Sequence, residues 1–135
     1  DTARFRQGFS KIGLVPDGGS SMTLQRLVGT ARAFELLYFS DVLGAEDAVR
    51  IGLANRVVPT DALPAEAAAW AQRLAAGPAK ALRLAKANLR GAMGMDMEEA
   101  LQNEAGAQVQ CLTGSDPIAG VMAFMSKSPA VFTER

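Results

Sequence analysis

The sequence pattern changes at Pro59, and this change limits the fold more than any other feature of the chain. Before Pro59, short apolar runs such as residues 12–15 alternate with segments of helical spacing, which is typical of α/β proteins. After Pro59 every apolar segment has helical spacing, and alanine and methionine are frequent. We therefore predict an α/β segment over residues 1–59 and an all-helical segment over residues 60–135.

Local start and stop signals set the expected elements. Gly29 and Gly52 follow helical stretches and predict their ends. Ser20 and Ser21 are expected to cap a helix start, and the run Asp96-Met97-Glu98-Glu99 has the pattern of a capping box. Together these signals predict helices over 20–28, 31–39, 45–51, 64–76, 79–90, 97–112 and 116–126. They also predict a short strand or extended entry over 3–9, a minimal strand over 57–58 and a buried segment over 12–15.

The composition excludes several classes of function. Fourteen basic residues balance fourteen acidic ones, so no net field favours nucleic acid as a partner. The chain has no histidine, which removes histidine-dependent nucleophilic schemes and histidine metal sites, and we expect no metal. One cysteine, Cys111, allows no internal disulfide and fits a cytoplasmic location, and no apolar run approaches the roughly 20 residues needed to span a membrane.

Proton chemistry must therefore fall to carboxylates, lysine, Tyr38 or Cys111. Asp17 is the most informative carboxylate, because it lies between Pro16 and two glycines directly after an apolar run. It has two interpretations: a turn residue whose side chain bonds its own backbone, or an acid beside an apolar pocket. The spacing alone leaves both open.

Two residues near the end of the last predicted helix form a candidate binding pair. Phe124 and Lys127 place an aromatic face and an ammonium group about one turn apart, an arrangement that suits a purine and a phosphate. A charge that stabilises the helix C-terminus is the alternative interpretation of Lys127.

Three stretches, taken in order, resemble the enoyl-CoA hydratase/isomerase (crotonase) family. They are FRQGFSKIGLVPDGG at residues 5–19, RLVGTARAFEL with AEDAVRIGLANRVVP within residues 26–59, and DPIAGVMAFMSKSPAVF at residues 116–132. The resemblance implies the C-terminal portion of the crotonase-like spiral fold, followed by a helical trimerisation region. It also implies that the chain, which starts without methionine, is the C-terminal half of a longer family member.

The resemblance implies that acyl-CoA is the substrate and that no cofactor is needed. The two N–H donors that hold the thioester oxyanion belong to the family's other half. Family hydratases carry a catalytic glutamate in the pattern Phe-Gly-x-Pro-Glu-x-x-x-Gly, and Phe9 stands at that glutamate position here. Asp17 stands where several isomerase members carry their acid. The pair implies double-bond isomerisation with Asp17 as proton shuttle and Phe9 in substrate binding.

The resemblance also implies that Phe124 stacks on the adenine of CoA and Lys127 neutralises its phosphate, within a homotrimer or hexamer. Two alternatives stay open. In the first alternative, the chain belongs to a hydratase, or to another crotonase-type lyase or hydrolase, that uses carboxylates from the other half. Otherwise it is a catalytically silent fragment that serves as an assembly and CoA-lid module.

Overall fold

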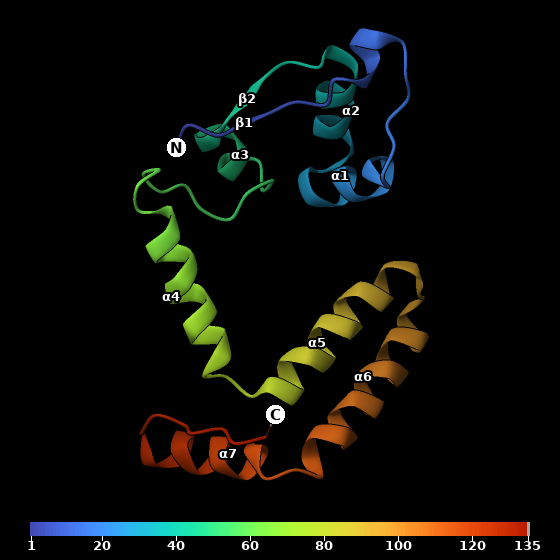
Figure 1. The fold of residues 1–135 in the computed structure, drawn as a ribbon. Coiled ribbons are helices and arrows are strands. Elements are labelled where there is room, and N and C mark those ends of the chain that lie inside the picture. The colour runs from blue at the N-terminus through green and yellow to red at the C-terminus, as the bar shows by residue number, and fades with distance from the viewer. Residues whose placement is uncertain (135) are drawn as a thin grey trace. The chain divides into compact units, whose positions relative to one another are not determined.

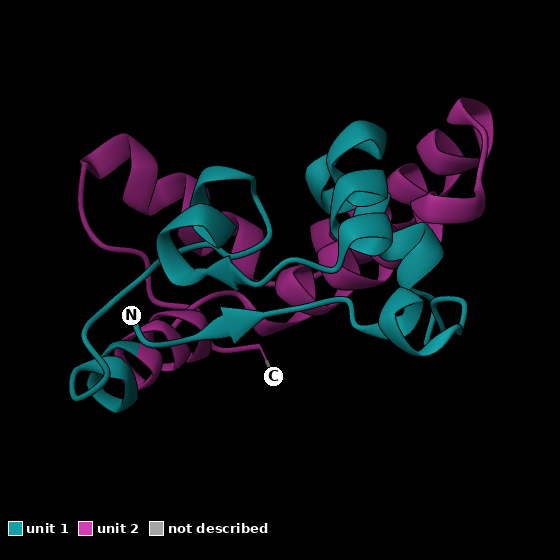
Figure 2. Cartoon of the chain, turned by 90° about the horizontal axis from the view of Figure 1, so that it is seen from above, with its two compact units in different colours: residues 1–66 teal, residues 67–135 magenta. Residues whose placement is uncertain are grey.

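The computed structural model describes residues 1–134, and the chain divides into two compact units, residues 1–66 and residues 67–135 (Figure 2). In unit 1, β1 (Arg4–Phe5) pairs antiparallel with β2 (Leu43–Gly44). Only Arg4–Phe5 of the predicted segment over residues 3–9 is a strand, because Phe9 begins a 3-10 helix, and the strand at Leu43–Gly44 was not predicted. The other elements of unit 1 are η1 (Phe9–Ile12, a 3-10 helix), α1 (Ser20–Val28), α2 (Thr30–Phe39) and α3 (Ala45–Arg50).

Helices α1 and α2 pack against each other around a small buried core in unit 1. Leu24 of α1 and Ala33 of α2 are buried, and Ala45 and Ala48 of α3 are buried as well. Gly29 ends α1 and precedes α2 with a φ of 79°, which glycine adopts without the steric cost that a Cβ brings. The predicted ends at Gly29 and at Gly52, which has a φ of 80°, are confirmed.

Ser40 connects the end of α2 to the segment that leads into η1. Its hydroxyl donates to the Gln7 carbonyl and lies 2.6 Å from the Ser10 hydroxyl, and its own carbonyl accepts from Arg6 Nε at 2.8 Å. Because Ser40 is almost fully buried, these bonds satisfy polar groups that water cannot reach. They hold the start of η1 against α2.

Three sequence predictions in unit 1 are wrong. Ser20 and Ser21 lie inside the first turn of α1, whose N-cap is Gly19 with no side-chain bond. Residues 57–58 form no strand, because no strand of the described chain pairs with them. Residues 12–15 are exposed, and Val15 reaches 80%. Apolar spacing can predict a face suited to burial, but burial itself needs a second surface.

Unit 2 consists of helices. Its elements are most of α4 (Leu63–Ala75), α5 (Ala79–Gly91), η2 (Ala92–Gly94), α6 (Met97–Leu112) and α7 (Asp116–Ser126). Helices α5 and α6 pack as a hairpin (Figure 1). The predicted capping box is confirmed: Asp96 accepts from the Glu99 N–H at 2.9 Å, and the Glu99 carboxylate accepts from the Asp96 N–H at 3.1 Å.

Candidate functional site

A tight turn carries Asp17 between η1 and α1. The Asp17 carbonyl accepts from the Ser20 N–H at 3.0 Å and from the Ser20 hydroxyl at 2.7 Å. The two residues between them, Gly18 and Gly19, have φ values of 59° and 80°. A turn with two positive φ values in succession is readily formed by two glycines, because other residues meet the steric penalty of the left-handed region. The Gly-Gly pair therefore suits the backbone of this turn.

The turn uses the backbone of Asp17 and leaves its side chain free. Its exposed carboxylate makes no hydrogen bond or ion pair with any other residue that the structure describes. A turn-forming aspartate ordinarily bonds the backbone two residues on through its carboxylate. That explanation of Asp17 does not hold here, because the bonds to Ser20 come from the main chain.

A cavity of about 410 Å³ lies next to this turn, within unit 1. Its volume is in the range of small-molecule sites, and its walls are mostly apolar. Pro16, the residue before Asp17, is one of its walls, and α2 provides Phe34 and Tyr38, whose rings meet edge to face at 5.1 Å. The full lining is Phe9, Ser10, Leu14, Val15, Pro16, Ser21, Gln25, Thr30, Ala33, Phe34, Leu37 and Tyr38.

Phe9 is half-buried in this cavity and begins the 3-10 helix η1. Its carbonyl accepts from the Leu14 N–H at 3.0 Å, which closes the segment around Gly13. No Asp, Glu, Lys or Arg is among the lining residues. The cavity can therefore hold an apolar group, and Asp17 is the carboxylate next to it in the chain.

The second pair of predicted residues lies at the end of α7 in unit 2. Phe124 is 85% exposed, and Lys127 is exposed as the C-cap of the helix. The Ser128 N–H donates to the Ala123 carbonyl at 2.9 Å and the Lys127 N–H to the Phe124 carbonyl at 3.2 Å. This pair of bonds is a Schellman motif, in which Lys127 takes the left-handed position with a φ of 52°.

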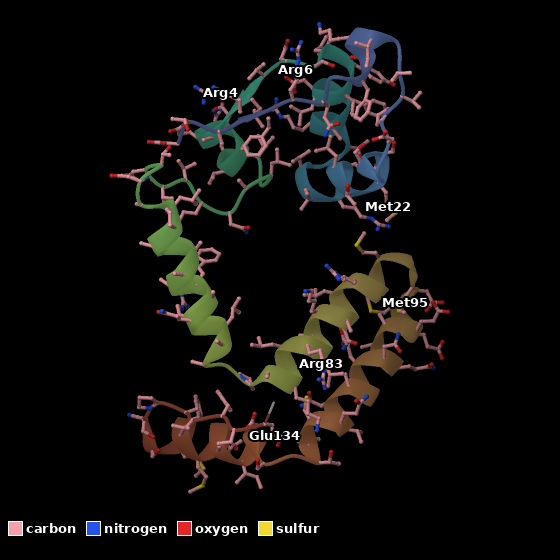
Figure 3. The ribbon with its side chains drawn as sticks, in the orientation of Figure 1. Arg4, Arg6, Met22, Arg83, Met95 and Glu134 are labelled. Atoms are coloured by element: carbon pink, nitrogen blue, oxygen red, sulfur yellow. The ribbon has the colours of Figure 1, made fainter. Side chains whose placement is uncertain are left out.

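Residues 127–134, here named the C-terminal strap, run back along α7 (Figure 1). The Asp116 carboxylate accepts from the N–H groups of Thr133 and Glu134 at 2.8 and 3.3 Å. In return, the Glu134 carboxylate accepts from the N–H groups of Ser115 and Asp116 at the start of α7, where Figure 3 places it. The end of the strap is thus bonded to the first turn of the helix.

These contacts change the acidity of Glu134. The hydrogen bond from the Asp116 N–H, helped by the bonds from Ser115 and the charge of Lys80, lowers the pKa of Glu134 below its ordinary value. Lys80 Nζ lies 3.6 Å from the carboxylate. Glu134 is therefore held ionised at the positive end of the α7 dipole.

The four predicted site residues fall into two groups. Phe9 and Asp17 belong to one cavity and its adjoining turn in unit 1, whereas Phe124 and Lys127 share the last turn of α7 in unit 2. Sequence reasoning missed Asp116 and Glu134, because a bond between residues 18 apart leaves no periodic signal. Among residues 1–134, no three side chains that could ligate a metal gather together, and no helix is long and apolar enough to cross a membrane.

An apolar cavity, with a carboxylate on the turn that follows one of its walls, is suited to proton transfer on an apolar organic substrate. One family profile, described as enoyl-CoA hydratase/isomerase, matches residues 1–135. The chain therefore belongs to the enoyl-CoA hydratase/isomerase family, as its three stretches predict.

Individual relatives agree with this assignment. The crotonyl-CoA hydratase of Syntrophomonas wolfei is 37% identical over 133 residues, which cover 98% of this chain and 51% of the relative. The solved enoyl-CoA hydratase/isomerase of Cupriavidus metallidurans has a TM-score of 0.89 at 35% identity and matches 98% of this chain and 51% of its own. The enoyl-CoA hydratase of Bacillus anthracis gives 0.88 at 29% identity, over 96% and 50%.

The fold is thus the C-terminal portion of the crotonase fold, and the prediction of fold class is confirmed. The chain spans about half the length of most of the relatives it matches.

Proposed function

We propose that this chain contributes to an enzyme that isomerises the double bond of an acyl-CoA, with Asp17 as the proton shuttle. The carboxylate takes a proton from one carbon of the acyl chain, the negative charge passes to the thioester oxygen as an enolate, and Asp17 returns the proton to another carbon. The double bond moves, and atoms and charge balance. The N–H donors that stabilise the enolate come from the family's other half.

One observation carries this proposal: Asp17, whose carboxylate has no partner among the described residues, directly follows Pro16, a wall of an apolar cavity that has no charged lining residue. Two-carboxylate hydration needs a second carboxylate, which acts as a general base and activates the water. Where family hydratases carry this catalytic glutamate, the chain has Phe9, which lines the cavity and has no group that accepts a proton. A single acid is sufficient for isomerisation, in which the same proton leaves and returns.

The test is Asp17→Asn in the complete protein, with isomerisation of an unsaturated acyl-CoA as the assay. We expect a loss of roughly 100-fold or more in kcat, because a general base contributes about this much, and little change in acyl-CoA binding. Asp61→Asn is the matched control, since Asp61 is another exposed aspartate of unit 1. Retained turnover in Asp17→Asn would contradict the proposal.

Enoyl-CoA hydration is the second candidate function, because the relatives named above include a crotonyl-CoA hydratase. The two activities separate in one experiment. Water addition to a 2-enoyl-CoA at a rate well above isomerisation favours hydration. In that case, carboxylates of the family's other half activate the water.

We also propose that α7 takes part in a homo-oligomer, a trimer or hexamer, and that its last turn binds the adenosine end of CoA. Apolar side chains along α7 are more than half exposed, as a subunit contact requires. They are Ile118, Val121, Met122, Phe124 and Met125.

A further inference from the structure

Lys127 has a backbone conformation that lysine ordinarily avoids. Its φ of 52° lies in the left-handed region, where the Cβ of a residue other than glycine comes too close to the following carbonyl oxygen. The same position of a Schellman motif is usually glycine, which has no Cβ. Strain of this kind persists only where the surrounding structure fixes it, and it is frequent at ligand clamps.

The C-terminal strap provides that constraint. At its near end, the N–H groups of Lys127 and Ser128 are bonded to carbonyls of α7. At its far end, Thr133 and Glu134 are bonded to Asp116. Between these anchors the Phe132 ring lies against Gly120. A Cβ at position 120 would be 3.5 Å from the nearest atom of the ring. Lys127 therefore begins a segment that is fixed to α7 at both ends.

Asp116 is the central group of the far anchor. It is 5% exposed, and its Oδ1 accepts both strap N–H groups, whereas its Oδ2 has no partner within the described chain. Burial of a carboxylate is costly unless its bonds compensate. The two hydrogen bonds that the Asp116 carboxylate accepts both come from the strap.

We propose that Asp116 is a positioning residue for the CoA-phosphate site: it holds the strap in place and thereby keeps Lys127 left-handed. This rests on the proposed role of Lys127 in binding CoA. When the strap is released, Lys127 relaxes to right-handed geometry, a change in φ of roughly 115° that redirects its side chain.

A double-mutant cycle in the full chain tests this coupling, with CoA affinity measured by titration calorimetry. We expect Lys127→Met to weaken CoA binding roughly tenfold, as the loss of one charge-assisted bond does. Asp116→Ala should weaken it by a similar factor. The double variant should bind no worse than Lys127→Met alone, because Asp116 acts only through Lys127.

A second readout follows the Lys127 backbone itself. Its ¹³C shifts and amide coupling constant, measured by NMR, distinguish left-handed from right-handed geometry. We expect the left-handed signature in the unmodified chain, its loss in Asp116→Ala, and its recovery in Asp116→Asn, which keeps the Oδ1 acceptor. Glu134→Ala removes the more exposed anchor and should weaken the signature without threatening the buried side of α7.

The outcomes separate the two proposals. Additive losses in the double variant, or an unchanged Lys127 signature in both Asp116→Ala and Glu134→Ala, overturn the positioning role of Asp116. Full CoA affinity in Lys127→Met overturns the proposed role of Lys127, while the NMR signature still decides whether the strap controls its backbone.

Discussion

Two residues other than glycine have positive φ values in the described chain, Ser40 and Lys127, and their surroundings differ. Ser40 is buried, and its hydroxyl bonds to Gln7 and Ser10, which offsets the strain within the fold. The exposed Lys127 side chain makes no such bond to a described residue. The side-chain bonds of Ser40 thus compensate for its backbone strain, whereas the side chain of Lys127 provides no such compensation.

Lys127→Gly should therefore stabilise the fold while it weakens CoA binding. Glycine adopts the left-handed position freely, so we expect the free energy of unfolding to rise by about 1 kcal/mol. Denaturant titration measures the gain, and calorimetry with CoA measures the loss. Lys127→Ala keeps the strain and lacks the ammonium group, so it should lose affinity with no gain in stability. A less stable Lys127→Gly chain would contradict this account.

At the scale of single elements, α6 is the helix whose start is best defined. Asp96 and Glu99 bond each other's backbone N–H groups, which satisfies two donors that the helix itself cannot use. The start of α7 is satisfied differently, because Glu134 reaches its first N–H groups from the far end of the strap. One helix is capped locally and the other by a distant residue.

Asp96→Ala should lower the free energy of unfolding by about 1 kcal/mol, the usual cost of losing a side-chain N-cap. Thermal or denaturant unfolding followed by circular dichroism measures it. Glu98→Ala is the control, since Glu98 lies in the same turn but takes no part in the capping box. Equal losses in both variants would mean that the dipole, and not the cap, stabilises this end.

The strap should be sensitive to acid. The folded chain lowers the pKa of Glu134, so its bonds stabilise the fold above the ordinary value of 4.5 and lose this contribution as the pH falls through the folded pKa. Between about pH 6 and about pH 3, we expect the melting temperature to fall further in the unmodified chain than in Glu134→Gln. Parallel curves for the two proteins would show that Glu134 contributes nothing.

At the scale of the whole molecule, exposed apolar surface is the dominant feature. Residues 12–15 in unit 1 and the apolar face of α7 in unit 2 both lie open to solvent in the described chain. Large exposed apolar patches are uncommon on monomeric proteins and mark surfaces that bind other proteins or ligands. We expect these surfaces to be covered in the working assembly.

Charge placed on α7 should therefore break the proposed oligomer. We expect Met122→Glu with Met125→Glu to shift the sedimentation coefficient from that of a trimer or hexamer to that of a monomer. Both methionines are largely exposed, so the fold of the chain itself should tolerate the change. Gln102→Glu adds charge at an exposed position of α6 and is the control. A monomeric unmodified chain would exclude the proposal outright.

The sequence predicted the features of this fold that depend on neighbouring residues. The capping box at Asp96 and the glycine stop at Gly29 are confirmed, because both rely on bonds or dihedrals within a few positions. It failed where a distant partner decides. Residues 57–58 have no strand to pair with, and the bond between Asp116 and Thr133 depends on how the chain folds back.

The pairing of β1 with β2 implies that the two units form at different stages of folding. The pairing of Phe5 with Leu43 closes a loop of roughly forty residues but forms only two residue pairs. The entropic cost of closing this loop therefore comes before most of the stabilising contacts of the unit have formed. The α5–α6 hairpin joins neighbours along the chain and needs no such closure. During folding, amide protons of the hairpin should become protected from exchange first, and those of the ladder last.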